Sequence, residues 1–268
     1  TDGIFLNPRN LSNLATQMSV TGILAVGMLM VIVSGNIDLS VGSILGFAGA
    51  VSAFLITNHQ YGLMTAILAA IMVAVAVGVL QGALTAYLNI PAFIVTLGGL
   101  LAWRGATKWL LEGNTIPIAD ETYKFIGQGN LPSIYGWLLA AAAAAFIIAM
   151  AVKRARDVKR YGLGEADYVS RLLAAVIPLA AILGFIWVMN SYQGVPIPVL
   201  ILLGVALLGA FLTGSTTFGR YLYAIGGNEE AARLSGINTK KILLSVYMLG
   251  GLLAGVSGII MASRLNSA

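Results

Sequence analysis

Long apolar runs dominate the chain, and short polar breaks separate them. A helix needs about 20 mostly apolar residues to cross roughly 30 Å of hydrocarbon. A membrane β-barrel would instead alternate polar and apolar residues in segments of about ten, and no such alternation is present. The pattern therefore predicts an all-α, polytopic transmembrane helical bundle with about eight spans, at 12–34, 42–57, 63–88, 92–111, 137–152, 172–189, 197–213 and 242–262.

The composition narrows the possible functions. Of the 268 residues, 59% are hydrophobic and 9% are charged, against about 25% charged in an ordinary soluble domain. This excludes a soluble enzyme and a disordered chain. Cysteine is absent and His59 is the single histidine, so disulfides, thiolate metal sites and His-pair sites are excluded. No Gly-Lys dipeptide occurs, which excludes a Walker A phosphate loop.

The few charges predict the orientation in the membrane. Cytoplasmic loops collect Lys and Arg. Residues 153–171 hold six of them, and residues 214–241 hold Arg220, Arg233, Lys240 and Lys241. Both loops are therefore predicted to be cytoplasmic, and the more acidic segment 112–136 is predicted to lie outside.

The ends of the chain suggest a fragment. It begins at Thr1 rather than Met, and Ala268 follows six residues after the last apolar segment. No basic stretch and cleavage site precede an apolar run, so we expect no signal peptide. We expect residues 1–268 to form a single transmembrane domain that belongs to a longer chain.

The polar break at 34–41 (SGNIDLSV) has two interpretations. Irregular backbone at membrane depth survives only where it is buried in protein or lines a wet cavity, which is where transport paths lie. The alternative is a tight cytoplasmic turn with Asp38 as a solvated cap. Either Asp38 or Ser40 is suited to cap a helix that starts near Val41.

Arg104 and Lys108 lie one helical turn apart on a predicted span. An ionisable residue inside a membrane is a functional candidate by default. Both residues lie in the outer part of their helix, however, so snorkelling to the outer surface or structural pairing explains them equally simply.

A short helix is predicted inside the 214–241 loop. Asn228 is suited to cap it, Glu229 and Glu230 favour its first turn, and Gly236 ends it. A mere connection between two spans does not need such a helix. It is either a docking element for a cytoplasmic partner or a helix lying at the membrane interface.

The stretch Gly255–Gly258 matches the G-x-S-G of intramembrane serine proteases. A serine nucleophile needs a base within hydrogen-bond reach, and His59 falls in a predicted outer loop. Ser257 also lies in a pattern of small residues four apart, which recurs at Gly78/Gly82 and Gly251/Gly255. Helix packing is therefore the favoured role of Ser257.

Three stretches resemble the membrane permeases of bacterial ABC sugar importers, the branched-chain amino acid/ribose/xylose permease family. They are GNIDLSVGSILG (35–46), IPAFIVTLGGLLAWRG (90–105) and GRYLYAIGGNEEAARLSGINTKKI (219–242). The two helices and basic loop at 137–189 are similar to the xylose permease subgroup. The resemblance implies that Asp38 and Ser40 belong to the family's I-D-L-S motif, and that a coupling helix docks into the ATPase through Asn228, Glu229, Glu230, Ala231, Ala232, Arg233, Leu234, Ser235 and Gly236.

The resemblance implies a non-catalytic permease subunit for a pentose, D-xylose foremost, in the bacterial inner membrane. A second permease copy, a cytoplasmic ABC ATPase that binds ATP and Mg, and a periplasmic sugar-binding protein are the implied partners, with no cofactor in this chain and no nucleic acid. A neutral sugar needs polar groups that accommodate hydroxyls. The candidates along the path are Asn36, Asp38, Ser40, Gln81 and Thr96. The alternative is an ion-coupled secondary transporter of a small neutral solute.

Overall fold

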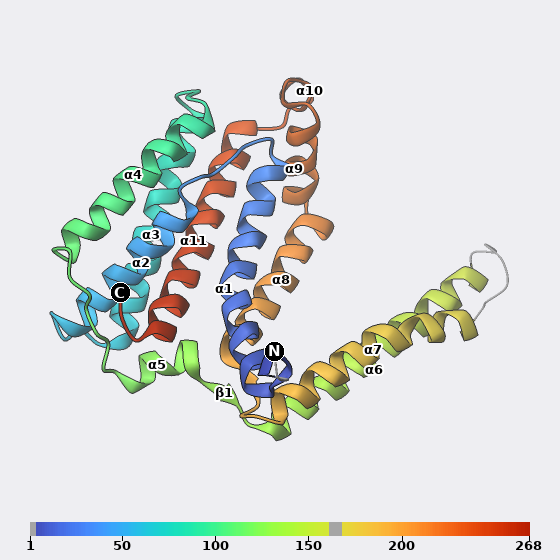
Figure 1. Cartoon of the computed structure of the whole chain (residues 1–268). Helices are drawn as coiled ribbons and strands as arrows, with labels where there is room; N and C mark the ends of the chain where they lie inside the picture. The colour runs from blue at the N-terminus through green and yellow to red at the C-terminus, as the bar shows by residue number, and fades with distance from the viewer. Residues whose placement is uncertain (1–3, 161–167) are drawn as a thin grey trace. The chain divides into compact units, whose positions relative to one another are not determined.

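The computed structural model describes residues 4–160 and 168–268, which fall into two compact units (Figure 1). The first unit takes in residues up to Ala15 and those between Asn130 and Pro196. It contains β1 (Asn130–Leu131), α6 (Ser133–Arg160), α7 (Tyr168–Asn190) and β2 (Val195–Pro196). The second unit takes in Thr16–Gly129 and Ile197–Ala268. It contains α2 (Val41–Thr57), α3 (Leu63–Ala86), α4 (Ala92–Leu110), α5 (Glu121–Gln128), α8 (Ile197–Ser215), α9 (Thr217–Gly227), α10 (Glu229–Leu234) and α11 (Thr239–Leu265), together with most of α1 (Pro8–Val33), while η1 (Ile4–Leu6) precedes it in the first unit.

The predicted all-α polytopic bundle is confirmed, and each of the predicted spans coincides with a helix. Among the described residues, 6 helices are long and apolar enough to cross a membrane: α1, α3, α6, α7, α8 and α11. Helix α2 is apolar but has 17 residues, and α4 has 19 residues and carries Arg104 and Lys108.

The structure differs from the predicted loops in three places. Helix α6 continues through the basic residues as far as Arg160, because Lys and Arg are good helix formers once a helix leaves the apolar run. Residues 161–167 of that predicted loop lie outside the described residues. The 214–241 segment holds the unpredicted helix α9 in addition to α10. Strands β1 and β2 pair antiparallel, with Asn130 opposite Pro196.

Helix α11 lies at the centre of the second unit and packs against α3, α2 and α5. Its closest contacts are between backbones. A Cβ added at Gly251 would meet the Ala74 carbonyl and Gly78, and one added at Gly258 would meet the Leu45 carbonyl. Such close approach is what small residues four apart allow. Gly46, which follows Gly42 by four residues on α2, faces open space instead.

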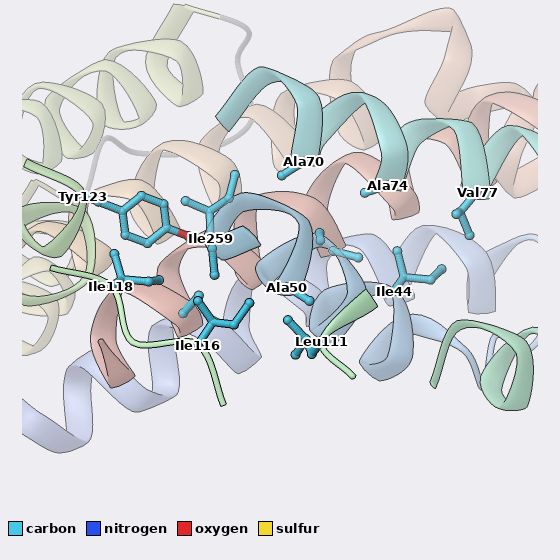
Figure 2. Packing of buried hydrophobic residues seen from close by; sticks show 14 residues of the cluster. Ile44, Ala50, Ala70, Ala74, Val77, Leu111, Ile116, Ile118, Tyr123 and Ile259 are labelled. Carbon is cyan, nitrogen blue, oxygen red and sulfur yellow. The ribbon is translucent and has the colours of Figure 1, made fainter. Parts of the chain in front are cut away.

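An apolar core fills the space between α2, α3 and α11 (Figure 2). At one end it is closed by α5, where Tyr123 is fully buried. The Tyr123 hydroxyl lies 2.6 Å from the Ser52 Oγ, and the Ser263 hydroxyl donates to the Tyr123 carbonyl at 2.6 Å. Burial raises the pKa of Tyr123 to about 12, so the hydroxyl stays protonated and available for the hydrogen bond with Ser52. The end of the unit that α5 closes is called the α5 end below.

Substituting Gly251→Val tests the close contact between α11 and α3. The added side chain has no space between the two backbones, so we expect a loss of about 1–3 kcal/mol, typical of overpacking. The thermal unfolding midpoint of the detergent-purified chain measures it. Gly204→Val on α8, where a Cβ meets nothing within 4 Å, is the matched control. Equal midpoints for the two variants would contradict the packing described here.

Candidate translocation site and docking helix

A seven-residue link, 34–40, joins α1 to α2. Its first residues form an ordinary hydrogen-bonded helix C-terminus. Gly35 has φ +80, which a glycine adopts without strain. The Asn36 N–H donates to the Val31 carbonyl at 3.1 Å. The Asn36 side chain turns back onto Ser34, donating to its carbonyl and its Oγ at 3.1 Å each. Asn36 therefore stabilises the link locally and is not among the residues gathered below.

Along the link the polar side chains are buried and the apolar side chains are exposed, the reverse of the burial pattern in a water-soluble protein. Asp38 and Ser40 are buried, at 7% and 0% exposure, whereas Ile37 and Leu39 are 53% and 36% exposed. An extended segment in water hides its apolar side chains. One surrounded by lipid does the opposite, because hydrocarbon offers polar groups no partners. Asp38 is therefore not a solvated cap.

The helix lengths indicate that the link descends into the bundle. Helices α2 and α3 are joined by residues 58–62 and have 17 and 24 residues. At 1.5 Å per residue, the first residue of α2 lies roughly 10 Å short of the level where α3 ends. The positive end of α2 thus points at buried side chains, as half-helices do in many transporters.

Asp38, Ser40 and Gln81 form a buried chain of hydrogen bonds. The Asp38 Oδ1 accepts from the Ser40 backbone N–H at 2.7 Å and lies 2.6 Å from the Ser40 Oγ. The Val41 N–H lies close to this carboxylate. The Ser40 Oγ lies 3.0 Å from Gln81 Oε1 on α3. The carboxylate therefore satisfies the N–H of Ser40. Ser40 occupies the N-cap position of α2 without making a capping bond of its own.

Thr96 ties α4 to the same place. Its hydroxyl lies 2.8 Å from the Ala92 carbonyl and 3.2 Å from the Ile37 carbonyl of the link. The structure therefore brings four of the five predicted path residues together: Asp38, Ser40, Gln81 and Thr96.

Three further residues join this cluster that the sequence did not reveal: Thr85, Trp103 and Tyr247. Gln81 Nε2, Thr85 Oγ1, Trp103 Nε1 and the Tyr247 hydroxyl are buried without a hydrogen-bond partner. The Tyr247 hydroxyl lies next to Thr85, but not in hydrogen-bond geometry. Buried polar atoms are nearly always paired in native proteins, so a group of orphans in one place marks a site suited to water or a polyhydroxyl solute.

For two of these three residues, helical spacing from a predicted path residue was the one sequence signal available. Thr85 follows Gln81 by four residues and Trp103 follows Thr96 by seven, so each shares a helix face with a predicted path residue. Tyr247 comes from α11, far away in sequence, and only the packing of α11 against α3 brings it here.

The amide of Gln81 has a second orientation with better partners. Amide oxygen and nitrogen are assigned from their surroundings. With the two amide atoms exchanged, Nε2 donates to Ser40 Oγ, and Ser40 Oγ donates to Asp38. The amide oxygen then lies beside Gly99, on the side where Trp103 Nε1 also lies. A Cβ added at Gly99 would collide with this amide.

Arg104 and Lys108 lie away from this cluster. Together with Gly42, Ser43, Gly46, Leu100 and Thr107 they line an open groove of about 440 Å³. Both are exposed. Among the described side chains the one ion pair joins Lys124 to Glu121, so structural pairing does not explain these two cations.

Ser257 is buried, and its hydroxyl donates to the Val20 carbonyl at 3.4 Å. His59 contacts the Phe54 and Tyr61 rings instead, after the end of α2. The described residues thus place no base near Ser257, which supports its packing role.

Helix α10 has the predicted boundaries. The Asn228 Oδ1 accepts from the Ala231 N–H at 2.9 Å, Glu229 and Glu230 lie in the first turn, and Gly236 follows the helix with φ +85. One side chain, Ala232, is buried and packs with Ala86, Ile225 and Leu243. The other members of the predicted coupling segment are exposed: Asn228, Glu229, Glu230, Ala231, Arg233, Leu234, Ser235 and Gly236.

Helix α9 fixes α10 to the bundle. Leu222 and Ile225 are buried, and Gly226 fits against the Val33 carbonyl so closely that a Cβ there would collide with it. Leu234, 80% exposed, projects from the other side of α10. The helix thus has a buried attachment and a charged outer surface with one apolar side chain. The end of the second unit that carries α10 is called the α10 end (Figure 1).

Comparison with known proteins decides the family. The family described as Branched-chain amino acid transport system / permease component matches residues 10–268. The chain belongs to this permease family. It is therefore a transport subunit rather than an enzyme, and a multi-pass protein of the inner membrane.

Two xylose transport system permease proteins, XylH of Haemophilus influenzae and XylH of Escherichia coli, are each 41% identical to this permease over 100% of its length. The permease covers 71% and 68% of those two chains. The ribose import permease protein RbsC of Escherichia coli is 34% identical over 98% of the permease, which covers 64% of it. No solved structure gives a significant match.

Replacing Asp38 tests the hydrogen bonds that close the link. Asp38→Leu leaves the N–H group of Ser40 buried without an acceptor, at a cost of about 1–3 kcal/mol. Asp38→Asn keeps one acceptor oxygen, and we expect it to lose much less. Thermal unfolding of both detergent-purified variants measures the difference. A solvated Asp38 would make the two variants equally stable.

Proposed function

We propose that this chain is the permease subunit of an ABC importer that carries a pentose, D-xylose foremost, across the bacterial inner membrane. The relatives named for xylose support the substrate, since their identity over the whole chain exceeds that of the ribose relative. The observation that carries the proposal is the buried cluster of polar groups around Asp38, Ser40 and Gln81, beside a break in the first spans.

The cluster suits a neutral, hydroxyl-rich solute. Its carboxylate is occupied by hydrogen bonds from the link. In either orientation of Gln81, one atom of its amide is bonded to Ser40. The groups left over are the other amide atom, two hydroxyls and an indole N–H, which exchange hydrogen bonds with sugar hydroxyls without introducing charge. Asp38, Ser40, Gln81 and Thr96 are the proposed path residues, joined by Thr85, Trp103 and Tyr247. Asn36 contributes through the shape of the link.

Energy comes from a partner in this proposal. The chain has no phosphate loop, and a cytoplasmic ABC ATPase binds ATP and Mg. Segment 228–236 is the proposed coupling helix. Its buried Ala232 attaches it to α3, α9 and α11, and its exposed Glu229, Glu230, Arg233 and Leu234 offer charges and an apolar anchor to the ATPase.

The α10 end faces the cytoplasm, because Arg220, Arg233, Lys240 and Lys241 gather there. The α5 end faces the periplasm and receives the sugar-binding protein. Two copies of the permease form the path between them. When ATP binding closes the ATPase subunits, α10 rotates and moves the end of α1 together with the link. This movement opens the polar cluster alternately to the periplasm and to the cytoplasm.

Charge reversal on α10 tests the docking. In Glu229→Lys/Glu230→Lys the first turn loses its favourable interaction with the helix dipole and presents the opposite charge to the ATPase. We expect the ATPase to be lost on co-purification and sugar-stimulated ATP hydrolysis to vanish. Glu121→Lys at the α5 end, where the side chain is 86% exposed, is the control for assembly and retains the ATPase on co-purification. Undiminished assembly of the α10 variant would refute the coupling role.

Transport by the reconstituted complex tests the substrate and the path. Xylose-loaded binding protein is expected to stimulate ATP hydrolysis and uptake into vesicles more than ribose-loaded protein does. We expect Gln81→Leu to lower uptake about tenfold, the effect of one lost hydrogen bond to the solute, while the ATPase still co-purifies. An ion-coupled carrier predicts the contrary result, with uptake that needs no ATPase and collapses when an ionophore is added.

A further inference from the structure

The α6–α7 hairpin of the first unit carries a feature that the transport proposal does not use. On α6, Ala145, Ile148, Ala149 and Val152 follow one another at helical spacing along one face. They line an open groove of about 770 Å³ that ends at Lys153, Arg156 and Asp157. The small alanine side chains make the hollow, and the charges stand at one end of it.

A second groove on the same hairpin repeats the arrangement. It has a volume of about 360 Å³ and is bounded by both helices and by Pro178 within α7. Its single charged residue is Arg154, and the rest of its lining is apolar: Phe146, Ile147, Met150, Ala151, Ala174 and Ala175.

The three cations are available to a ligand. Lys153, Arg154 and Arg156 are exposed, and none of them forms an ion pair with a described side chain, Asp157 included. With Asp157 counted, the two grooves together present three positive charges and one negative charge. All of them lie where α6 leaves its apolar run.

We propose that the first groove binds an anionic phospholipid, whose phosphate contacts Lys153 and Arg156 and whose acyl chain lies along Ala145, Ile148, Ala149 and Val152. A ligand here needs an anion and a hydrocarbon chain joined in that order along the membrane normal. A basic cluster directly beyond a membrane helix is attracted to an anionic lipid surface. A soluble anion leaves the apolar groove empty.

Native mass spectrometry of the whole chain in mild detergent tests this. The protein is titrated with phosphatidylglycerol and, in parallel, with phosphatidylcholine of the same acyl chains. We expect phosphatidylglycerol to be retained preferentially. In Lys153→Gln/Arg156→Gln the apparent affinity is expected to fall about thirtyfold, since each cation near an anionic surface contributes a factor of about five.

Two further variants make the test specific. Lys240→Gln/Lys241→Gln removes the same charge from an exposed pair on α11 and is expected to keep the lipid. Ala149→Phe keeps every charge but fills the groove, and is expected to lose the lipid. Because Gln is a good helix former and Ala149 is exposed, all the variants are expected to fold, which circular dichroism checks.

The proposal is overturned by any of three results. One is equal retention of the two lipids. Another is an equal loss in both double Lys/Arg→Gln variants, which indicates unspecific attraction. The third is displacement of the lipid by glycerol phosphate at matched concentration, which indicates a simple anion site.

Discussion

The fold depends on the inability of hydrocarbon to form hydrogen bonds. This constraint turns almost every apolar run into a helix, and it makes the link between α1 and α2 the costly exception. Its backbone and side chains are therefore satisfied from within the protein. Asp38 accepts from the start of α2, and Thr96 approaches the Ile37 carbonyl from α4. The polar cluster follows from the break, because the groups that stabilise the link have to come from α2, α3 and α4.

The close packing of α11 makes this arrangement possible. Backbone contact between Gly251 and α3, and between Gly258 and α2, brings three helices within reach of one another. Lipid competes for apolar side chains as well as another helix does, so contacts between small residues stabilise such bundles where burial of large ones would not. The same contacts bring Tyr247 of α11 next to Thr85 of α3. Packing and the candidate path are thus parts of one arrangement.

Much of this was predictable from local pattern. The spans, the break at 34–41 and the boundaries of α10 depend on neighbouring residues alone, and Asn228 and Gly236 have the roles that their types predict. The extension of α6 to Arg160 was missed because a run of Lys and Arg is compatible with either a loop or a helix. The positions of Trp103 and Tyr247 in the cluster were not predictable, because they depend on which faces of α4 and α11 turn inward. The burial of Asp38 was likewise not predictable, because it depends on tertiary contacts with other helices.

The contact of Gly226 with the Val33 carbonyl has a mechanical consequence. Two backbones in direct contact have no flexible side chain between them that could absorb a displacement. The last turn of α1 and the α9–α10 corner are therefore expected to move together, and the first glycine beyond this contact is Gly35, two residues after Val33. In the proposed coupling role, a force on α10 would reach the backbone a few residues before Asp38, and a short segment rather than the tilt of a whole helix would then move the link.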